Sequence, residues 1–219
     1  ADEYRNMTID FTKLAVSGVQ GLRAYQPGKP VDELAREYGL NPADIVKLAS
    51  NENPMGPSDK ALAAIQAEFT DLTRYPDGNG FDLKSALSKS LDVTMEQLTL
   101  GNGSSDILEF IVKCFVAKDD DVIVSQHAFA IYGLVTKTVG GNLIQVPAKN
   151  WGHDLPAMAA AITDKTKIIF VTNPNNPTGT WNSKTELESF LKAVPSNVIV
   201  LLDEAYFEYV GEAEYPSGI

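Results

Sequence analysis

The chain has few of the residues that build disulfides and metal sites. Among its 219 residues are one cysteine, Cys114, and two histidines, His127 and His153. A single cysteine excludes a disulfide within the chain, and the apolar segment 111–116 around Cys114 predicts a buried, inert thiol. Neither histidine has a second histidine at ligand spacing, and cysteines are not clustered, so we expect no metal. We expect His153 to be an ordinary loop residue.

Positive charge and long apolar runs are also scarce. Lys and Arg number 18 against 29 Asp and Glu, which gives a net charge of -11. Nucleic-acid binding depends on neutralising phosphates with basic side chains, so this balance disfavours a nucleic-acid partner. No apolar run approaches the roughly 20 residues that span a bilayer, and the first residues lack the pattern of a signal peptide. We therefore expect a cytoplasmic protein without a membrane partner.

Two apolar runs without alternation, 167–171 and 198–202, flank a polar segment with a helical pattern. Such runs are typical of strands buried on both faces, and strand, helix, strand predicts a parallel βαβ unit. Further strands are predicted at 45–48, 97–100, 122–125 and 143–146, with helices at 31–38, 58–69, 82–91, 107–115, 129–139 and 154–162. The sequence predicts an α/β fold, a three-layer sandwich around a mainly parallel central sheet.

Both strands of the βαβ unit end in polar residues. Segment 173–179 reads Asn-Pro-Asn-Asn-Pro-Thr-Gly and follows the first strand, and segment 203–206 reads Asp-Glu-Ala-Tyr and follows the second. Ligands of open parallel sheets bind at the carboxyl ends of the strands. Asn176 and Asp203 are therefore candidate site residues.

A glycine turn before a helix predicts an anion site. Segment 101–106 reads Gly-Asn-Gly-Ser-Ser-Asp, and free N–H groups at a helix start, together with the helix dipole, favour negative charge. A dinucleotide-binding turn needs glycine at the sixth position, where Asp106 stands and would repel a pyrophosphate. A single phosphate held by Gly103, Ser104 and Ser105 fits better. A nucleotide-binding α/β protein remains the less favoured reading.

The segments at 173–179 and 203–206 resemble the fold-type I aminotransferases, which use pyridoxal phosphate (PLP). Segments 21–30, 48–54 and 75–78 are similar to the histidinol-phosphate aminotransferase branch, and the resemblance covers nearly the whole chain. It implies conversion of L-histidinol phosphate and 2-oxoglutarate to imidazole acetol phosphate and L-glutamate. Aromatic amino acid aminotransferases and threonine-phosphate decarboxylases share the same cofactor residues and remain alternatives.

The resemblance also implies roles for individual residues around PLP. Asp203 pairs with the protonated ring nitrogen, and Asn176 and Tyr206 donate to the phenolic oxygen. Phe129 stacks on the ring, and Gly103, Ser104 and Ser105 hold the phosphate. A homodimer is implied as well, because the matching tyrosine in the family, here Tyr75, reaches the cofactor phosphate of the other subunit. The residues implied on the substrate side are Tyr25, Asn51, Glu52 and Asn53.

The resemblance divides the chain into two regions. Residues 1–56 match an N-terminal arm and part of a small domain, and residues 57–219 match the large PLP-binding domain. The family's Schiff-base lysine falls beyond Ile219, so these 219 residues alone are expected to be inactive. A binding or regulatory module without the lysine is the alternative of another class.

Overall fold

The computed structural model describes residues 10–219, and their contacts form two units. One unit joins residues 10–23 to Glu96–Ile219, and the other is Ala24–Met95. The boundary that the sequence suggested, between residues 56 and 57, stays a prediction for the domains of the whole protein.

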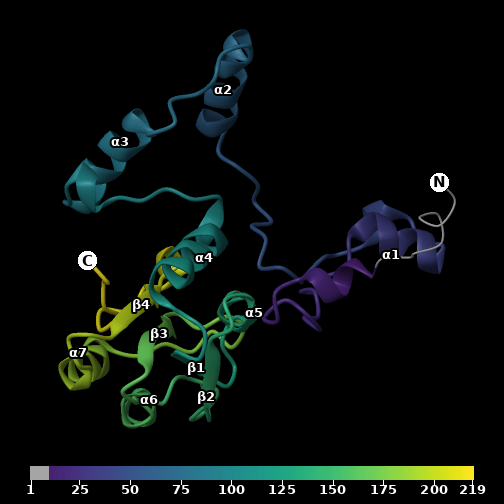
Figure 1. Cartoon of the computed structure of the whole chain (residues 1–219). Helices are drawn as coiled ribbons and strands as arrows, with labels where there is room; N and C mark the ends of the chain where they lie inside the picture. Colours follow the sequence, from purple (N-terminus) through teal and green to yellow (C-terminus); the bar gives the residue numbers. More distant parts are fainter. Residues whose placement is uncertain (1–9) are drawn as a thin grey trace, which may run out of the picture. The chain divides into compact units, whose positions relative to one another are not determined.

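A four-stranded parallel sheet lies at the centre of the first unit (Figure 1). Its strands are β1 (Asp121–Ser125), β2 (Asn142–Val146), β3 (Thr166–Thr172) and β4 (Ile199–Asp203), in the order β2-β1-β3-β4. All three neighbouring pairs are parallel. β1 is buried throughout and β3 almost throughout, as expected of apolar runs without alternation. The predicted parallel α/β sheet is therefore confirmed.

Helices cover both faces of this sheet, as Figure 1 shows. α4 (Gly103–Phe115) and α5 (Ala130–Thr138) pack on one face, where Leu108 and Val135 join strand residues such as Phe170. α6 (Leu155–Ala160) and α7 (Lys184–Ala193) pack on the other, where Met158 and Phe190 form a second core with the opposite strand faces. The first unit is a three-layer sandwich.

Side-chain caps explain where α6 and α7 begin. At α7, the Ser183 hydroxyl accepts from the Glu186 N–H and the Glu186 carboxylate accepts from the Ser183 N–H, which makes a complete capping box. At α6, the Asp154 carboxylate accepts from the Ala157 N–H. The first cap fixes the start of the helix that connects β3 to β4, and the second fixes the start of the helix that connects β2 to β3.

The second unit contains α1 (Val31–Tyr38), α2 (Asp59–Glu68) and α3 (Phe81–Leu91). All three were predicted from the sequence. Gly39 ends α1 in the left-handed conformation with φ of 66°, and the Ser58 hydroxyl caps α2. α3 begins one residue before the predicted Asp82. The short 3₁₀ helices of the two units are η1 (Phe11–Leu14), η2 (Pro42–Asp44), η3 (Phe69–Asp71), η4 (Met95–Gln97) and η5 (Phe207–Tyr209).

Two predicted strands were wrong. Segment 45–48 is extended but unpaired among the described residues, with Val46 79% and Leu48 90% exposed. Residues 98–100 follow η4 as irregular chain, and no strand of the sheet pairs with them. Short apolar runs become strands only where another strand satisfies their backbone groups, and the local pattern carries no information about that partner.

The prediction of a buried Cys114 was also wrong, because its side chain is exposed. Leu108 and Val112, one helical turn apart, face the core from α4. Cys114 lies two positions after Val112, about 200° further around the helix, and therefore points outward.

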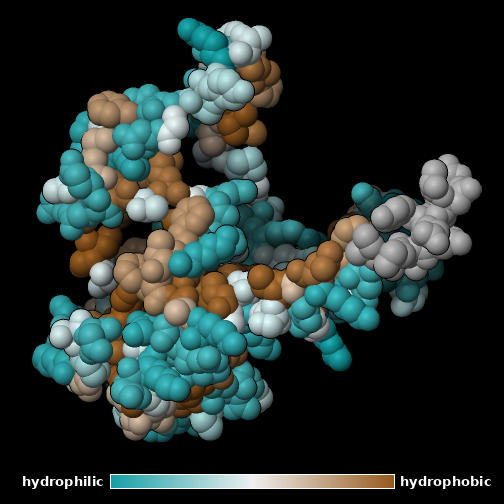
Figure 2. Space-filling view, viewed as in Figure 1, coloured by the Kyte–Doolittle hydropathy of each residue, from teal (hydrophilic) through white to brown (hydrophobic). Residues whose placement is uncertain are grey.

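Apolar side chains also gather on the outer side of α4, as Figure 2 shows, where Phe110 is 43% and Phe115 54% exposed.

Among residues 10–219, no helix has the length and apolar character needed to cross a membrane.

Candidate active site

The ends of β3 and β4 lie side by side. Thr172 and Asp203 are register partners, and the Asn173 N–H donates to the Asp203 carbonyl at 2.9 Å. The turn 173–179 therefore begins directly beside Asp203. The two polar segments therefore meet at the carboxyl edge of the sheet, as the sequence predicts.

The turn is held from both of its ends. The Asn173 side chain donates to the Asn182 carbonyl at 3.1 Å and accepts from the Asn182 N–H at 2.8 Å. The Gly179 N–H donates to the Asn175 carbonyl at 2.8 Å, and Gly179 has φ of 71°, a conformation that favours glycine. The Tyr215 hydroxyl donates to the Asn173 carbonyl. These bonds fix the backbone that presents the half-buried Asn176.

Asn175 ties the turn to the segment that follows β1. Its Nδ2 donates to the His127 carbonyl at 3.1 Å and lies 2.7 Å from the Thr178 hydroxyl. Its backbone N–H donates to the Thr180 carbonyl at 2.7 Å. The side chain is 3% exposed. Three strand ends, those of β1, β3 and β4, thus contribute to one site.

Asp203 is buried, at 7% exposure, and its carboxylate is fixed on both oxygens. The Tyr132 hydroxyl donates to Oδ2 at 2.7 Å, and the Ala205 N–H donates to Oδ1 at 3.2 Å. The single hydroxyl proton of Tyr132 is used in this bond, so the Thr172 hydroxyl, 2.7 Å away, donates to the Tyr132 oxygen. A chain of two hydroxyl groups therefore ends on the carboxylate.

Sequence reasoning missed Tyr132. Its side chain is fully buried, and burial, reinforced by the charge of Asp203, raises the pKa of its hydroxyl well above the ordinary value. The hydroxyl therefore stays protonated and acts as a donor. A signal was present: Tyr132 follows Phe129 by three residues, the spacing of neighbours on one helix face.

Phe129 lies directly before α5 and is half-buried. Its ring meets the Tyr132 ring edge to face, with centroids 5.9 Å apart and planes at 89°. Since Tyr132 bonds to Asp203, the structure brings Phe129 to the same edge of the sheet as the carboxylate.

Gly103, Ser104 and Ser105 form the exposed first turn of α4, so this helix begins four residues earlier than predicted. The Asp106 carboxylate accepts from the Asn102 N–H at 2.8 Å, which ties the helix start to the preceding loop. Gly103 has φ of 72°, and a β-carbon built on it would meet no atom within 4 Å. Ser104 and Asp203 line one hollow of about 280 Å³.

Tyr206 is half-buried and lies between β4 and η5, with its ring centroid 6.5 Å from that of Tyr209. Within the first unit, the structure therefore brings the turn with Asn176 to Asp203, links Phe129 to it through Tyr132 and places Ser104 on a shared hollow. Tyr206 follows on the chain directly after this edge.

The remaining predicted residues belong to the second unit, and their part in the site stays a prediction. Tyr75 is fully exposed and Tyr25 is 49% exposed. Asn51 has φ of 50°, Glu52 pairs with Lys47, and the Asn53 side chain accepts from the Met55 N–H at 3.0 Å. The segment 51–53 is thus shaped by local contacts.

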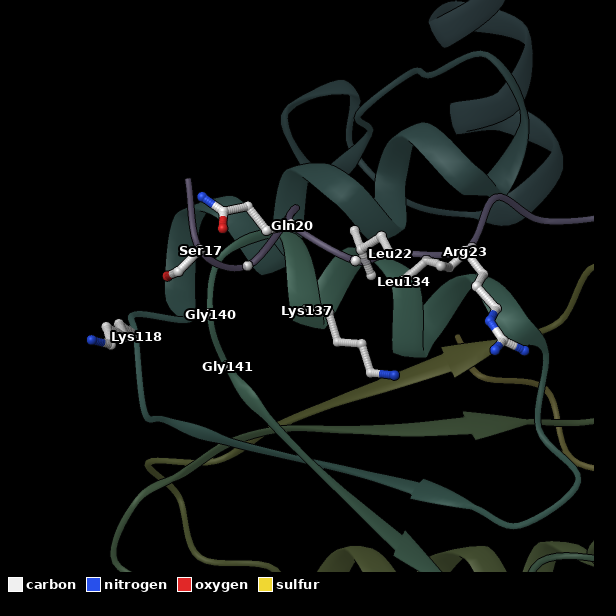
Figure 3. Close-up of a pocket in the computed structure, with 11 residues that line it drawn as sticks. Ser17, Gln20, Leu22, Arg23, Lys118, Leu134, Lys137, Gly140 and Gly141 are labelled. Atoms are coloured by element: carbon white, nitrogen blue, oxygen red, sulfur yellow. The ribbon is translucent and has the colours of Figure 1, made fainter. Parts of the chain in front are cut away.

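A larger hollow, about 620 Å³, lies where residues 17–23 run along the C-terminal part of α5 (Figure 3). Figure 3 shows that Lys118 points away from Lys137, whereas Arg23 lies on the same side as Lys137. Residues 10–219 contain no cluster of three or more His, Cys, Asp or Glu side chains suited to a metal.

Comparison with known proteins agrees with this geometry. The family model for aminotransferase class I and II matches residues 43–217. Histidinol-phosphate aminotransferase 2 of Pseudomonas fluorescens is 58% identical over 97% of the chain and 58% of its own length. Histidinol-phosphate aminotransferase 1 of Nitrosococcus oceani is 55% identical over 94% of the chain and 55% of its own length.

A solved structure is similar as well. The crystal structure of histidinol-phosphate aminotransferase from Sinorhizobium meliloti, in complex with pyridoxal-5'-phosphate, matches with a TM-score of 0.81 and 27% identity over 92% of the chain and 53% of that protein. The chain thus spans somewhat more than half the length of the relatives it matches. With a family match over most of its residues and a parallel sheet that carries the matching motifs, the chain belongs to the class I and II aminotransferases.

Proposed function

We propose that this chain forms part of a PLP-dependent histidinol-phosphate aminotransferase, which converts L-histidinol phosphate and 2-oxoglutarate to imidazole acetol phosphate and L-glutamate. The observation that carries the proposal is the 58% identity to a protein of that name over 97% of the chain. The site of the first unit supports it, because its polar groups suit the parts of PLP.

The first turn of α4 suits the phosphate of PLP. Its free N–H groups and the helix dipole favour an anion, and the Ser104 and Ser105 hydroxyls add donors. The open space at Gly103, which a larger residue would fill, leaves room for phosphate oxygens. The Asp106 carboxylate accepts the Asn102 N–H at the base of the turn, which fixes the start of the helix.

Asp203 suits the ring nitrogen. When bound, PLP takes up the electrons of the bond broken next to the substrate nitrogen, and it does so best with its ring nitrogen protonated. A buried carboxylate that is fixed by Tyr132 and the Ala205 N–H holds that proton by charge pairing without reorganising. The low exposure of Asp203 keeps competing water away from the pair.

We assign further residues to the remaining parts of the cofactor and to the substrate. The Asn176 amide and the Tyr206 hydroxyl are assigned as donors to the phenolic oxygen, and Phe129 is assigned to the ring face. On the substrate side we place Tyr25 and segment 51–53. Tyr75 is assigned to the phosphate of a second subunit in a homodimer, and its full exposure leaves its hydroxyl accessible to a partner. A biosynthetic role supports the cytoplasmic location that we propose for the protein. A Schiff-base lysine outside these 219 residues stays a prediction.

The test is a substrate comparison on the whole purified protein. With PLP added, we expect glutamate to form from 2-oxoglutarate with histidinol phosphate as amino donor, and the absorbance of the bound cofactor to change when histidinol phosphate is added alone. If phenylalanine is the preferred donor, the protein is an aromatic amino acid aminotransferase. If carbon dioxide is released from threonine phosphate, it is a threonine-phosphate decarboxylase. Absence of any PLP absorbance change would reject the aminotransferase proposal.

A further inference from the structure

His153 is buried beside the turn 173–179 and takes part in none of the roles above. Its side chain is 5% exposed, although it lies in the loop between β2 and α6. Its Nε2 accepts the backbone N–H of Thr172 at 3.3 Å. A nitrogen that accepts a hydrogen bond carries no proton, so the neutral ring carries its proton on Nδ1.

Two buried polar atoms at this place have no hydrogen-bond partner among the described residues: Nδ1 of His153 and Oδ1 of Asn175. One is a donor and the other an acceptor. The Asn175 amide orientation follows from its Nδ2, which donates to the His127 carbonyl, an atom that only accepts. Oδ1 therefore faces away from His127, and it is the free acceptor of this side chain.

The two side chains also influence each other. The loop that carries His153 and the turn are tied to each other through Thr180, whose carbonyl accepts the Asn175 N–H and whose hydroxyl donates to the Trp151 carbonyl. Burial lowers the pKa of His153 to about 4, and the Asn175 side chain opposes this shift. A buried donor and a buried acceptor that lack partners destabilise the folded state, so a small adjustment that pairs them is favoured. No hydrogen bond of ordinary geometry is formed between them in the structure.

We propose that His153 is a positioning residue: its Nδ1–H binds Asn175 Oδ1 and, with the Thr172 bond on its other nitrogen, clamps the turn that presents Asn176. Asn175 precedes Asn176 in the chain, and Thr172 is the last residue of β3 and the register partner of Asp203. One ring therefore sets the spacing between the turn and the strand end. Only the consequence for the cofactor rests on the proposed function, and the clamp itself does not.

Two substitutions separate the two halves of the clamp. His153→Asn keeps a donor at the distance of Nδ1 from the β-carbon and loses the acceptor for Thr172. His153→Gln keeps an acceptor at the distance of Nε2 and loses the Nδ1 donor. His127→Gln is the matched control, because the hydrogen bond of His127 to the turn comes from its backbone carbonyl, while its ring stacks on Trp151 with centroids 5.0 Å apart.

The first readout is hydrogen exchange of the Asn175 and Gly179 amides in the whole protein without PLP. We expect His153→Gln to exchange at least tenfold faster at these two amides, and His153→Asn and the control to stay within about threefold of the unaltered protein. Equal acceleration in both His153 variants would overturn the clamp, since that result indicates loss of packing alone. If a variant does not fold, the second readout tests the proposal without it.

The second readout needs no substitution at position 153. Nitrogen NMR of histidine-labelled protein, assigned with His127→Gln, is expected to show His153 as the neutral form with the proton on Nδ1 between pH 6 and 8. A proton on Nε2, or a ring that titrates near its ordinary pKa, would overturn the proposal. PLP affinity, measured separately, is expected to fall about tenfold in His153→Gln. If the exchange result holds and PLP fails to bind the unaltered protein, the clamp stands and the proposed function does not.

Discussion

The hydroxyl of Tyr132 on α5 donates to the carboxylate of Asp203 at the end of β4, across 2.7 Å and 71 residues of chain. The bond connects the helix that carries Phe129 to the strand that carries the carboxylate. It is wholly buried, and the Thr172 hydroxyl completes it from β3. The position of the carboxylate therefore depends on α5, β3 and β4 together.

Removing the hydroxyl with Tyr132→Phe leaves Asp203 Oδ2 and the Thr172 hydroxyl without their buried partner. We expect the free energy of unfolding to fall by about 1–3 kcal/mol and PLP affinity to fall about tenfold. Chemical denaturation and cofactor titration measure the two effects. Tyr209→Phe, at a tyrosine that is 74% exposed, is the control and is expected to change neither. Unchanged PLP affinity in Tyr132→Phe would remove Tyr132 from the site.

Replacing the carboxylate itself with Asp203→Asn keeps the shape and removes the charge. Because a preorganised charge partner contributes on the order of 10²–10³ in rate, we expect kcat to fall at least about 100-fold while circular dichroism shows a folded protein. Asp164→Asn, at an exposed aspartate, is the matched control and is expected to keep full activity. Loss of less than tenfold in Asp203→Asn contradicts the assigned role.

Stability is expected to fall as the pH drops from about 6.5 to about 4. Folded His153 stays neutral down to a pKa of about 4, whereas an unfolded histidine binds its proton near 6.5, so the unfolded state takes up the extra proton in this window. The shift corresponds to roughly 3 kcal/mol, fully present above pH 6.5 and lost by pH 4.

Denaturation curves at several pH values measure this effect. The charged groups Lys149, Asp154 and Glu186 line the same hollow as His153. Subtracting the pH dependence of His153→Asn from that of the unaltered protein removes their contribution. An identical pH slope in both proteins would show that His153 is not the buried titrating group.

The exposed Cys114 is expected to react in the folded protein. A thiol-specific aromatic disulfide is predicted to label it within minutes without denaturant, since it lies on the outer side of α4. Cys114→Ser is expected to remove this fast phase and to change the free energy of unfolding by less than about 0.5 kcal/mol. If labelling requires unfolding, the Cys114 thiol is buried, as the sequence alone suggested.

The βαβ unit was predictable because its signals are local. The runs 167–171 and 198–202 lack alternation, and Ser183 and Glu186 form a capping box before the helix. The strands proposed at 45–48 and 97–100 failed for the opposite reason, since pairing depends on segments far away in the chain. Hydrophobic pattern alone therefore predicted the sandwich but not the limits of its sheet.

The site residues also divide into those that the sequence reveals and those that only the structure reveals. Asp203 and Asn176 stand out because polar residues at the ends of buried strands are unusual. Tyr132 and His153 did not, because nothing in the order of residues shows that a tyrosine 71 positions away reaches Asp203, or that a histidine 19 positions before Thr172 accepts its N–H. Side chains that position the site became visible only through tertiary contacts.

The pairing of Thr172 with Asp203 has a consequence for how sequences of this kind tolerate gaps. Successive side chains of a strand point to opposite faces, and Leu201 packs against α4 and α5 while Leu202 packs against α6 and α7. One residue gained or lost inside β4 would turn Asp203 toward α6 and α7, away from Tyr132. The same change in the exposed segment 195–197 leaves the alternation within β4, and with it the side of the sheet on which the carboxylate lies, unchanged. A change of length is therefore tolerated in that segment and disabling within the strand.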